Sequence, residues 1–233
     1  MIRHVKAAFL ALLAIFALGA VASASASASE LPEFRTATNG TTSGGEDEFV
    51  TKAGNVKCAK ETGEIKEEDK TKGTYTFTFS ECREPKLKLG CRSLGDDFND
   101  ETKPELGTIL LGGTWTVLAG PRQTPSAELL LELTEVHVEC SNATLSVTLL
   151  FLLKGDAIGL ITPEDSEAKE FKVEVETTKA EGTEQKEKTY ENDSGTIVEA
   201  KLEDSIDGGA TEAAGDDSSA VTLKMEKDTE IEK

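Results

Sequence analysis

The side chain in this sequence that is best suited to proton transfer is His137, which lies between Glu135 and Glu139. The other histidine, His4, falls within an expected export signal. A histidine beside carboxylates titrates near neutral pH and can act as a general base or a pH-responsive group. The valines on both sides of it indicate instead a strand with the histidine on the outer, polar face. We favour this second interpretation and predict no catalytic residue.

Carboxylates are abundant, and a pair of them is sufficient for glycoside hydrolysis. The chain contains 44 Asp and Glu residues, so a carboxylate-dependent secreted hydrolase is an alternative. Sugar-cleaving clefts usually present aromatic platforms, and here Trp115, Tyr75 and Tyr190 supplement the phenylalanines. Trp115 stands among glycine and aliphatic neighbours, which favours a place in the core. The zinc-protease and nucleophile-elbow motifs are absent from the sequence.

Two acidic segments could bind calcium, which prefers carboxylate and carbonyl oxygens, often on a glycine-containing turn. Neither matches the EF-hand spacing, because glycine is absent from the required position. A solvated polar loop explains the same residues, so we predict no cofactor and keep calcium as the one candidate metal. Its candidate ligands are Asp96, Asp97, Asn99, Asp100, Asp204 and Asp207.

Four cysteines lie outside the export signal, at Cys58, Cys82, Cys91 and Cys140. An even number in an exported protein favours disulfides, and the lack of a Cys-x-x-Cys motif argues against zinc. Of the three possible pairings we favour Cys58–Cys82 with Cys91–Cys140, because Cys58 and Cys82 lie in neighbouring strand-like segments. The bonds would close loops of 25 and 50 residues, which the chain-entropy model values at about 3–4 kcal/mol each.

Apolar and polar residues alternate with a period of two along much of the chain, which indicates half-buried strands. Polar residues such as Thr, Lys and Glu occupy the intervening positions. The apolar faces are Val56 and Cys58; Tyr75, Phe77 and Phe79; Phe171, Val173 and Val175; Val198, Ala200 and Leu202; and Val221, Leu223 and Met225.

A more buried strand is predicted at Leu145–Leu153, which is nearly continuous in apolar residues and too short to cross a bilayer. It can pair with Val136, Val138 and Cys140 across a turn at residues 141–144. Upstream, the leucines at 129, 131 and 133 have the opposite parity to these valines, so one strand through both needs a bulge or a break. A helix over Ala127–Leu133 is the alternative.

These segments predict an all-β fold, an antiparallel sandwich or barrel-like body of about ten to twelve short strands with two disulfides. We expect a single β domain over residues 49–233. Residues 29–48 are rich in Thr, Gly and Ser and are expected to form a flexible lead-in. A seam inside the domain could fall near residues 120–126 or 162–168, where prolines occur.

Residues 1–28 are typical of a cleaved secretory signal peptide. Arg3 and Lys6 form a basic head, Ala7–Val21 carries no charge, and small residues up to Ala28 offer cleavage sites. As a helix, the uncharged segment would be about 22 Å long, short of the roughly 30 Å hydrocarbon layer. We therefore expect a secreted, extracellular protein with no integral membrane segment after cleavage.

The charge balance excludes one large class of partners. Loss of Arg3 and Lys6 with the signal changes the formal net charge from −19 to −21. Such a surface repels nucleic acid and anionic membranes, since both are bound chiefly through their phosphates. We expect no nucleic-acid partner.

Short motifs along the chain resemble a group of uncharacterised secreted actinobacterial all-β proteins. The resemblance implies a signal peptide, an all-β body and paired cysteines, and it supplies no activity and no catalytic residues. This chain departs from the general pattern in being unusually rich in Glu and Lys. The motifs are Leu31–Phe34, Val56–Cys58, Thr76–Phe79 ahead of Cys82, Cys91, Gly107–Ile109, Leu111–Gly113, Val138–Cys140 and Gly159–Pro163.

Export, cysteine pairing, strong acidity and the lack of a catalytic constellation together favour a non-catalytic extracellular binding or surface-associated module. Its partner would be a cation, an extracellular protein or a cell-wall component, held by loops on a rigid scaffold. The alternatives are the hydrolase described above and a purely structural extracellular protein.

Overall fold

A computed structural model of the chain describes a body built from antiparallel strands, and the described residues contain no helix, as expected for an all-β fold. Leu31–Lys233 form one compact unit. The described residues are 32–36, 38–50, 54–94, 104–119, 127–142, 144–163, 167–175, 177–178, 184–185, 189–191, 196–206, 212–213, 215–216 and 220–232. The expected signal peptide, residues 1–28, lies outside them.

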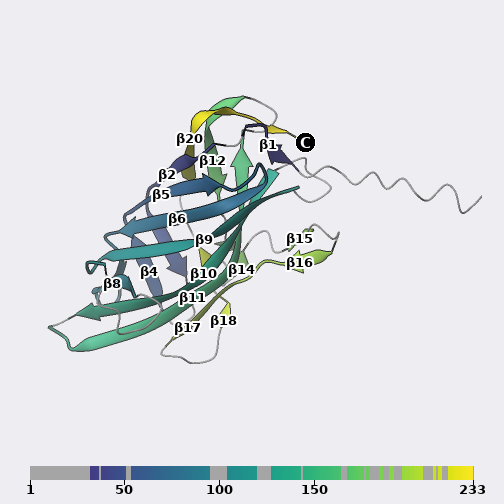
Figure 1. The fold of residues 1–233 in the computed structure, drawn as a ribbon. Coiled ribbons are helices and arrows are strands. Elements are labelled where there is room, and N and C mark those ends of the chain that lie inside the picture. Colours follow the sequence, from purple (N-terminus) through teal and green to yellow (C-terminus); the bar gives the residue numbers. More distant parts are fainter. Residues whose placement is uncertain are drawn as a thin grey trace, which may run out of the picture. The chain divides into compact units, whose positions relative to one another are not determined.

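Eight strands close into an antiparallel barrel, which decides between the predicted sandwich and barrel (Figure 1). Each strand pairs with the next around the ring, and the pairing of the last with the first closes it. Around the ring the strands are β11 (Val147–Thr162), β12 (Ala168–Glu174), β20 (Val221–Thr229), β2 (Gly40–Gly44), β5 (Lys60–Glu67), β6 (Lys72–Ser80), β9 (Thr108–Ala119) and β10 (Ala127–Asn142).

The period-two patterns in the sequence set the inner face of the barrel. On β6, Tyr75 and Phe79 are buried while Thr76 between them is exposed. On β20, Leu223 and Met225 are buried while Lys224 is exposed. Successive side chains of a strand point to opposite faces of the sheet. On these strands the apolar side chains therefore point into the barrel, and the polar and charged side chains between them face water.

The sheet forks where β10 changes partners. Its first half pairs with β9 and its second half with β8 (Leu89–Leu94), while β11 runs along the whole of its other side. Figure 1 shows β10 and β11 as two long strands lying side by side. From β8 the branch continues through β7 (Arg83–Glu84), β4 (Asn55–Cys58), β3 (Asp47–Val50) and β19 (Gly215–Asp216).

Short strands complete the unit. β17 (Leu202–Ile206) pairs with β11, and β18 (Glu212–Ala213) pairs with β17. Three two-stranded ribbons are β1 (Glu33–Phe34) with β21 (Ile231–Glu232), β13 (Thr177–Thr178) with β14 (Glu184–Gln185), and β15 (Thr189–Glu191) with β16 (Ile197–Glu199).

The predicted irregularity in the leucine-rich segment is confirmed. The register of β10 against β11 shifts between Leu133 and Val136, and this bulge keeps the leucines before it and the valines after it on the inner face. The helix considered for Ala127–Leu133 is wrong, because this segment is paired on both sides as a strand. The predicted pairing across the turn is confirmed, with Val138 opposite Phe151 and Cys140 opposite Leu149.

Two expectations need correction. Residues 29–48 do not form only a flexible lead-in, because β2 is a barrel strand and Phe34 on β1 is buried. The Thr, Gly and Ser residues that indicated a linker belong to β2, which pairs with β5 and β20. The single strand predicted over residues 198–203 is divided, because β16 ends at Glu199 and β17 begins at Leu202.

Two clusters of buried side chains fill the interior. The first core surrounds Trp115, which is 1% exposed, as predicted for a core residue. The ring of Phe34 packs edge-on against those of Trp115 and Phe171, at centroid distances of 5.8 and 6.0 Å. The second core contains all four cysteines together with apolar side chains such as Phe49, Ile109 and Phe151.

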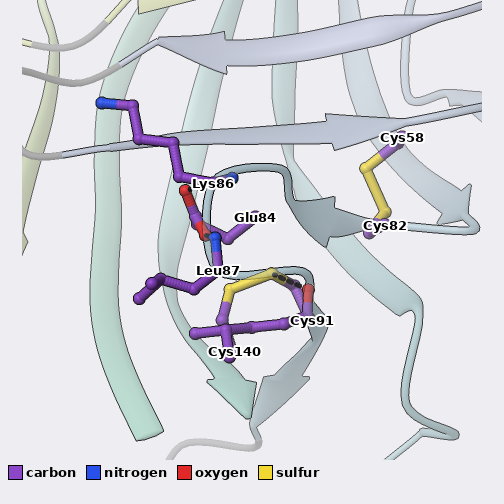
Figure 2. The surroundings of a disulfide bond; sticks show 8 residues. Cys58, Cys82, Glu84, Lys86, Leu87, Cys91 and Cys140 are labelled. Carbon is purple, nitrogen blue, oxygen red and sulfur yellow. Dashed lines mark hydrogen bonds between the residues drawn. A yellow bond between two sulfur atoms is a disulfide. The ribbon is translucent and has the colours of Figure 1, made fainter. Parts of the chain in front are cut away.

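The disulfides are Cys58–Cys82 and Cys91–Cys140, the pairing favoured from the sequence (Figure 2). Cys91 and Cys140 lie directly opposite each other on β8 and β10. The backbone N–H of Cys91 donates to the carbonyl of Cys82 at 2.9 Å, which ties the two bonds together. Close by, the carboxylate of Glu84 accepts the backbone N–H groups of Lys86 and Leu87 at 3.0 and 2.6 Å (Figure 2).

Removing either disulfide should destabilise the protein, because each constrains the unfolded chain. From the sequence separations of 24 and 49 residues, we expect losses of about 3.5 kcal/mol for Cys58→Ala with Cys82→Ala and about 4 kcal/mol for Cys91→Ala with Cys140→Ala. Urea unfolding followed by circular dichroism measures both. Double variants as stable as the oxidised wild-type protein would contradict this assignment.

Candidate functional site

The barrel interior contains a cavity of about 80 Å³ between the two cores. Side chains from both cores line it, so it lies where neither cluster fills the barrel completely. Most of its lining is apolar, with aromatic side chains on one side and leucines and valines on the other. Lining residues include Ile65, Tyr75, Leu129 and Val173 from the first core and Phe49, Phe79, Leu111 and Leu153 from the second.

Three side chains with hydrogen-bonding oxygens in addition to Tyr75 line the same cavity, namely Thr42 on β2, Asp47 on β3 and Glu61 on β5. They are 5%, 4% and 3% exposed. The hydroxyl of Thr42 donates to Oε1 of Glu61 at 2.9 Å. The polar lining therefore gathers on three strands that neighbour one another in space or in sequence, opposite a largely aliphatic wall.

Glycines make room for this polar group. Gly63 pairs with Thr42, and a Cβ at Gly63 would lie 2.6 Å from the Thr42 hydroxyl. Gly44 pairs with Glu61, and a Cβ at Gly44 would lie 3.0 Å from Oε2 of the carboxyl group. A larger residue at Gly63 would therefore displace the hydroxyl that orients Glu61.

The electrostatic surroundings favour the protonated form of Glu61. Burial, and to a smaller extent the charge of Asp47, raise the pKa of Glu61 from 4.5 to about 7, although the hydrogen bond from Thr42 opposes the shift. Tyr75 shares the cavity, and its pKa is also raised, mainly by burial and then by Asp156 and Glu132. Near pH 7, Glu61 can therefore accept or donate a proton within the cavity.

A second acidic pair lies at the fork of the sheet, where Glu132 on β10 is opposite Asp156 on β11. The pKa of Asp156 is raised by burial and then by the charge of Glu132. Next to this region, a groove of about 530 Å³ runs past Thr74, Thr114 and Glu135. The groove is more open to solvent and has a more polar lining than the barrel cavity, so the cavity is the better candidate site.

The site residues considered from the sequence are scattered. His137 is half-buried on β10, with Nε2 3.8 Å from Oε1 of Glu135. Asp204 is buried on β17; the other calcium candidates, Asp96, Asp97, Asn99, Asp100 and Asp207, lie outside the described residues. Within the described part of the chain, no three His, Cys, Asp or Glu side chains are grouped so that they could hold a metal ion.

The three polar residues of the cavity, Thr42, Asp47 and Glu61, were not predicted as site residues from the sequence. A signal for Glu61 was present, because it has the same parity as Ile65 in a segment of alternating residues and must share its face. For Thr42 and Asp47 no comparable signal exists, since their segment is short and rich in small and polar residues.

Comparison of the chain with models of protein families, with curated protein sequences and with solved structures gives no match. Across the described ranges, no helix is long and apolar enough to cross a membrane. The proposal for the function of the site therefore rests on the geometry and chemistry of its own residues.

Glu61 should make the stability of the protein depend on pH. Its folded-state pKa of about 7 exceeds the ordinary 4.5, so its contribution is fully present below pH 4.5 and is lost as the pH rises through 7. We expect the wild-type protein to lose on the order of 3 kcal/mol from this group between pH 4.5 and 8. In Glu61→Gln this part of the pH dependence should disappear, as measured by urea unfolding at a series of pH values.

The control for this experiment is Glu64→Gln, which removes the same charge from an exposed position of the same strand. Glu67, whose pKa is also raised to about 7, mainly by burial, remains in both variants and contributes equally. Identical pH profiles for the two variants would contradict the role given to Glu61.

Proposed function

We propose that the protein is a non-catalytic extracellular binding module that holds a small, largely apolar ligand inside its barrel. The observation that supports this is the cavity of about 80 Å³, with its apolar lining and its polar group at Thr42, Asp47 and Glu61. An enclosed apolar site with a few convergent polar groups is the usual form of a small-molecule binding site.

The architecture suits this function. An eight-stranded antiparallel barrel is just wide enough either to be filled by its own side chains or to hold one small ligand. Here side chains of both cores line a space that they do not fill. A site built on paired strands, rather than on loops, keeps its shape when the ligand leaves.

An unfilled cavity costs stability. At about 24 cal/mol per Å³, the 80 Å³ here correspond to roughly 2 kcal/mol of packing that the folded protein forgoes. A ligand that fills the space recovers this packing, and the free energy gained adds to its affinity. The buried carboxyl group of Glu61 has the same consequence, because the hydrogen bond from Thr42 does not fully offset its desolvation.

The two disulfides are consistent with folding in an oxidising environment. Together with the expected signal peptide over residues 1–28, they support a location outside the cell. The proposed ligand would then be met in the extracellular medium or at the cell surface.

The cavity favours binding over the hydrolase alternative. Glu61 and Asp47 are carboxyl groups in one site, as glycoside hydrolysis requires. A space of about 80 Å³ has room for roughly five to eight water-sized groups, which is too small for the two sugar rings on either side of a glycosidic bond. A purely structural protein, in turn, would have no use for a cavity that costs stability.

A direct test uses hexanol, whose six-carbon chain matches the size of the cavity. At 100 times its dissociation constant, hexanol should raise the free energy of unfolding by about 2.7 kcal/mol, as measured by thermal unfolding. Ala157→Leu, which places a larger side chain in the cavity wall, should abolish the effect. Thr148→Leu, at an exposed position of the same strand, should retain it.

The outcome that contradicts the proposal is equally clear. If hexanol does not stabilise the wild-type protein, or stabilises it and the Ala157→Leu variant equally, the cavity is not a binding site. Calorimetric titration provides the dissociation constant and separates binding from a general effect of the alcohol on the solvent.

A further inference from the structure

We propose that the cavity selects a small hydrophobic amine, with the hydrocarbon part lying against the leucines and the ammonium group meeting Glu61 beside Asp47. This inference rests on the proposed function, since it names the chemical class of the ligand for the same cavity. It goes beyond that function because an apolar cavity alone would favour uncharged compounds over an ammonium group, whose burial without a partner is costly.

Glu61 is the residue that would meet the ammonium group of the ligand. This side chain is 3% exposed to solvent and lines the cavity. Its Oε1 accepts the hydroxyl of Thr42 at 2.9 Å, and no donor from the described residues meets Oε2. A carboxylate that lines an apolar cavity and has one donor is costly, so the site is best completed by a ligand that brings an N–H group.

The charge of the cavity points to a cation rather than to a neutral donor. Two acidic side chains, Asp47 and Glu61, line it, and no Lys, Arg or His from the described residues does. Two carboxylates close together in an apolar space repel each other, which is one cause of the raised pKa of Glu61. An ammonium group offsets the charge of Glu61 and donates charge-assisted hydrogen bonds, which are about twice as strong as neutral ones.

The remaining residues that line the cavity indicate that the rest of the ligand is apolar. Leu131, Leu133 and Ala157 form an aliphatic wall, which stabilises a short hydrocarbon chain by burying it. Calcium is a poor occupant, because it takes six to eight oxygen ligands and the polar group offers three side chains. A carboxylate ligand would add a third negative charge and should be excluded.

The experiment compares hexylamine, hexanol and hexanoate, which share one chain length and differ in the charge of the polar group. Titration calorimetry at pH 8, where Glu61 is ionised, should give binding of hexylamine about ten-fold or more tighter than that of hexanol, and no binding of hexanoate. At pH 5, where Glu61 is protonated, the preference for the amine over the alcohol should shrink.

Variants identify the residue responsible. Glu61→Gln keeps the size of the side chain and removes its charge, so it should lose the ten-fold preference and bind hexylamine no more tightly than hexanol, because an unpaired ammonium group is costly to bury. Glu64→Gln, exposed on the same strand, should keep the wild-type preference. Circular dichroism verifies folding, and if Glu61→Gln does not fold, Asp47→Asn and the wild-type comparison of pH 8 with pH 5 decide the question.

The two proposals fail in different ways. If none of the three compounds binds, the cavity is not a ligand site and the proposed function fails with the amine. If hexanol binds as tightly as hexylamine at pH 8, or if Glu61→Gln keeps the preference, the function stands and the selection for an amine is wrong.

Discussion

The pairing of β10 with β11 is the interaction on which the rest of the structure depends. These two strands of 16 residues run antiparallel from Ala127 opposite Ile161 to Asn142 opposite Val147. Their ladder closes the barrel, because each also pairs with one of its other strands, β9 and β12. The same two strands place Leu131, Leu133 and Ala157 around the cavity, and β10 also pairs with β8, where Cys140 lies opposite Cys91. Without it, the sheet would have two open edges and no enclosed space.

Burial of the carboxyl groups of Glu61 and Asp47 is a second constraint on the structure. It lowers the stability of the closed barrel that the pairing of β10 with β11 creates. The cores and the disulfides stabilise a closed barrel, whereas carboxyl groups in an apolar space lower its stability unless they are protonated or meet a partner. Thr42 supplies one hydrogen bond, and the raised pKa of Glu61 shows that this bond does not compensate for burial. A group that costs stability and lines a cavity is typical of a functional site, because a core selected for stability alone would contain an apolar residue there.

Much of the fold could be predicted from residue patterns. The strands around Tyr75, Phe171 and Leu223 were predicted because each alternates cleanly. The change of parity in the leucine-rich segment predicted the bulge before Val136, and the positions of the cysteines in neighbouring strands favoured the correct pairing. The strand β2 was missed because its inward residues are Gly40, Thr42 and Gly44, which carry no hydrophobic signal. The strand β3 was missed because it has four residues and Phe49 is its one apolar inward residue, beside Asp47. Thr42 and Asp47 of the candidate site lie on these strands and were missed for the same reasons, whereas Glu61 on β5 shares its parity with Ile65 and could have been found.

Residue patterns alone specify which faces of the strands are apolar, that the cysteines come in two pairs, and that the chain is strongly acidic. These properties are local or compositional, so neighbouring residues are sufficient to specify them. The closure of the sheet, the space between the two cores and the presence of Asp47 and Glu61 in that space depend on how the whole chain packs. Closure joins strands that are far apart in the chain, such as β2 with β20, and a cavity exists only where the side chains of many strands fail to fill the same volume. No single segment contains that information.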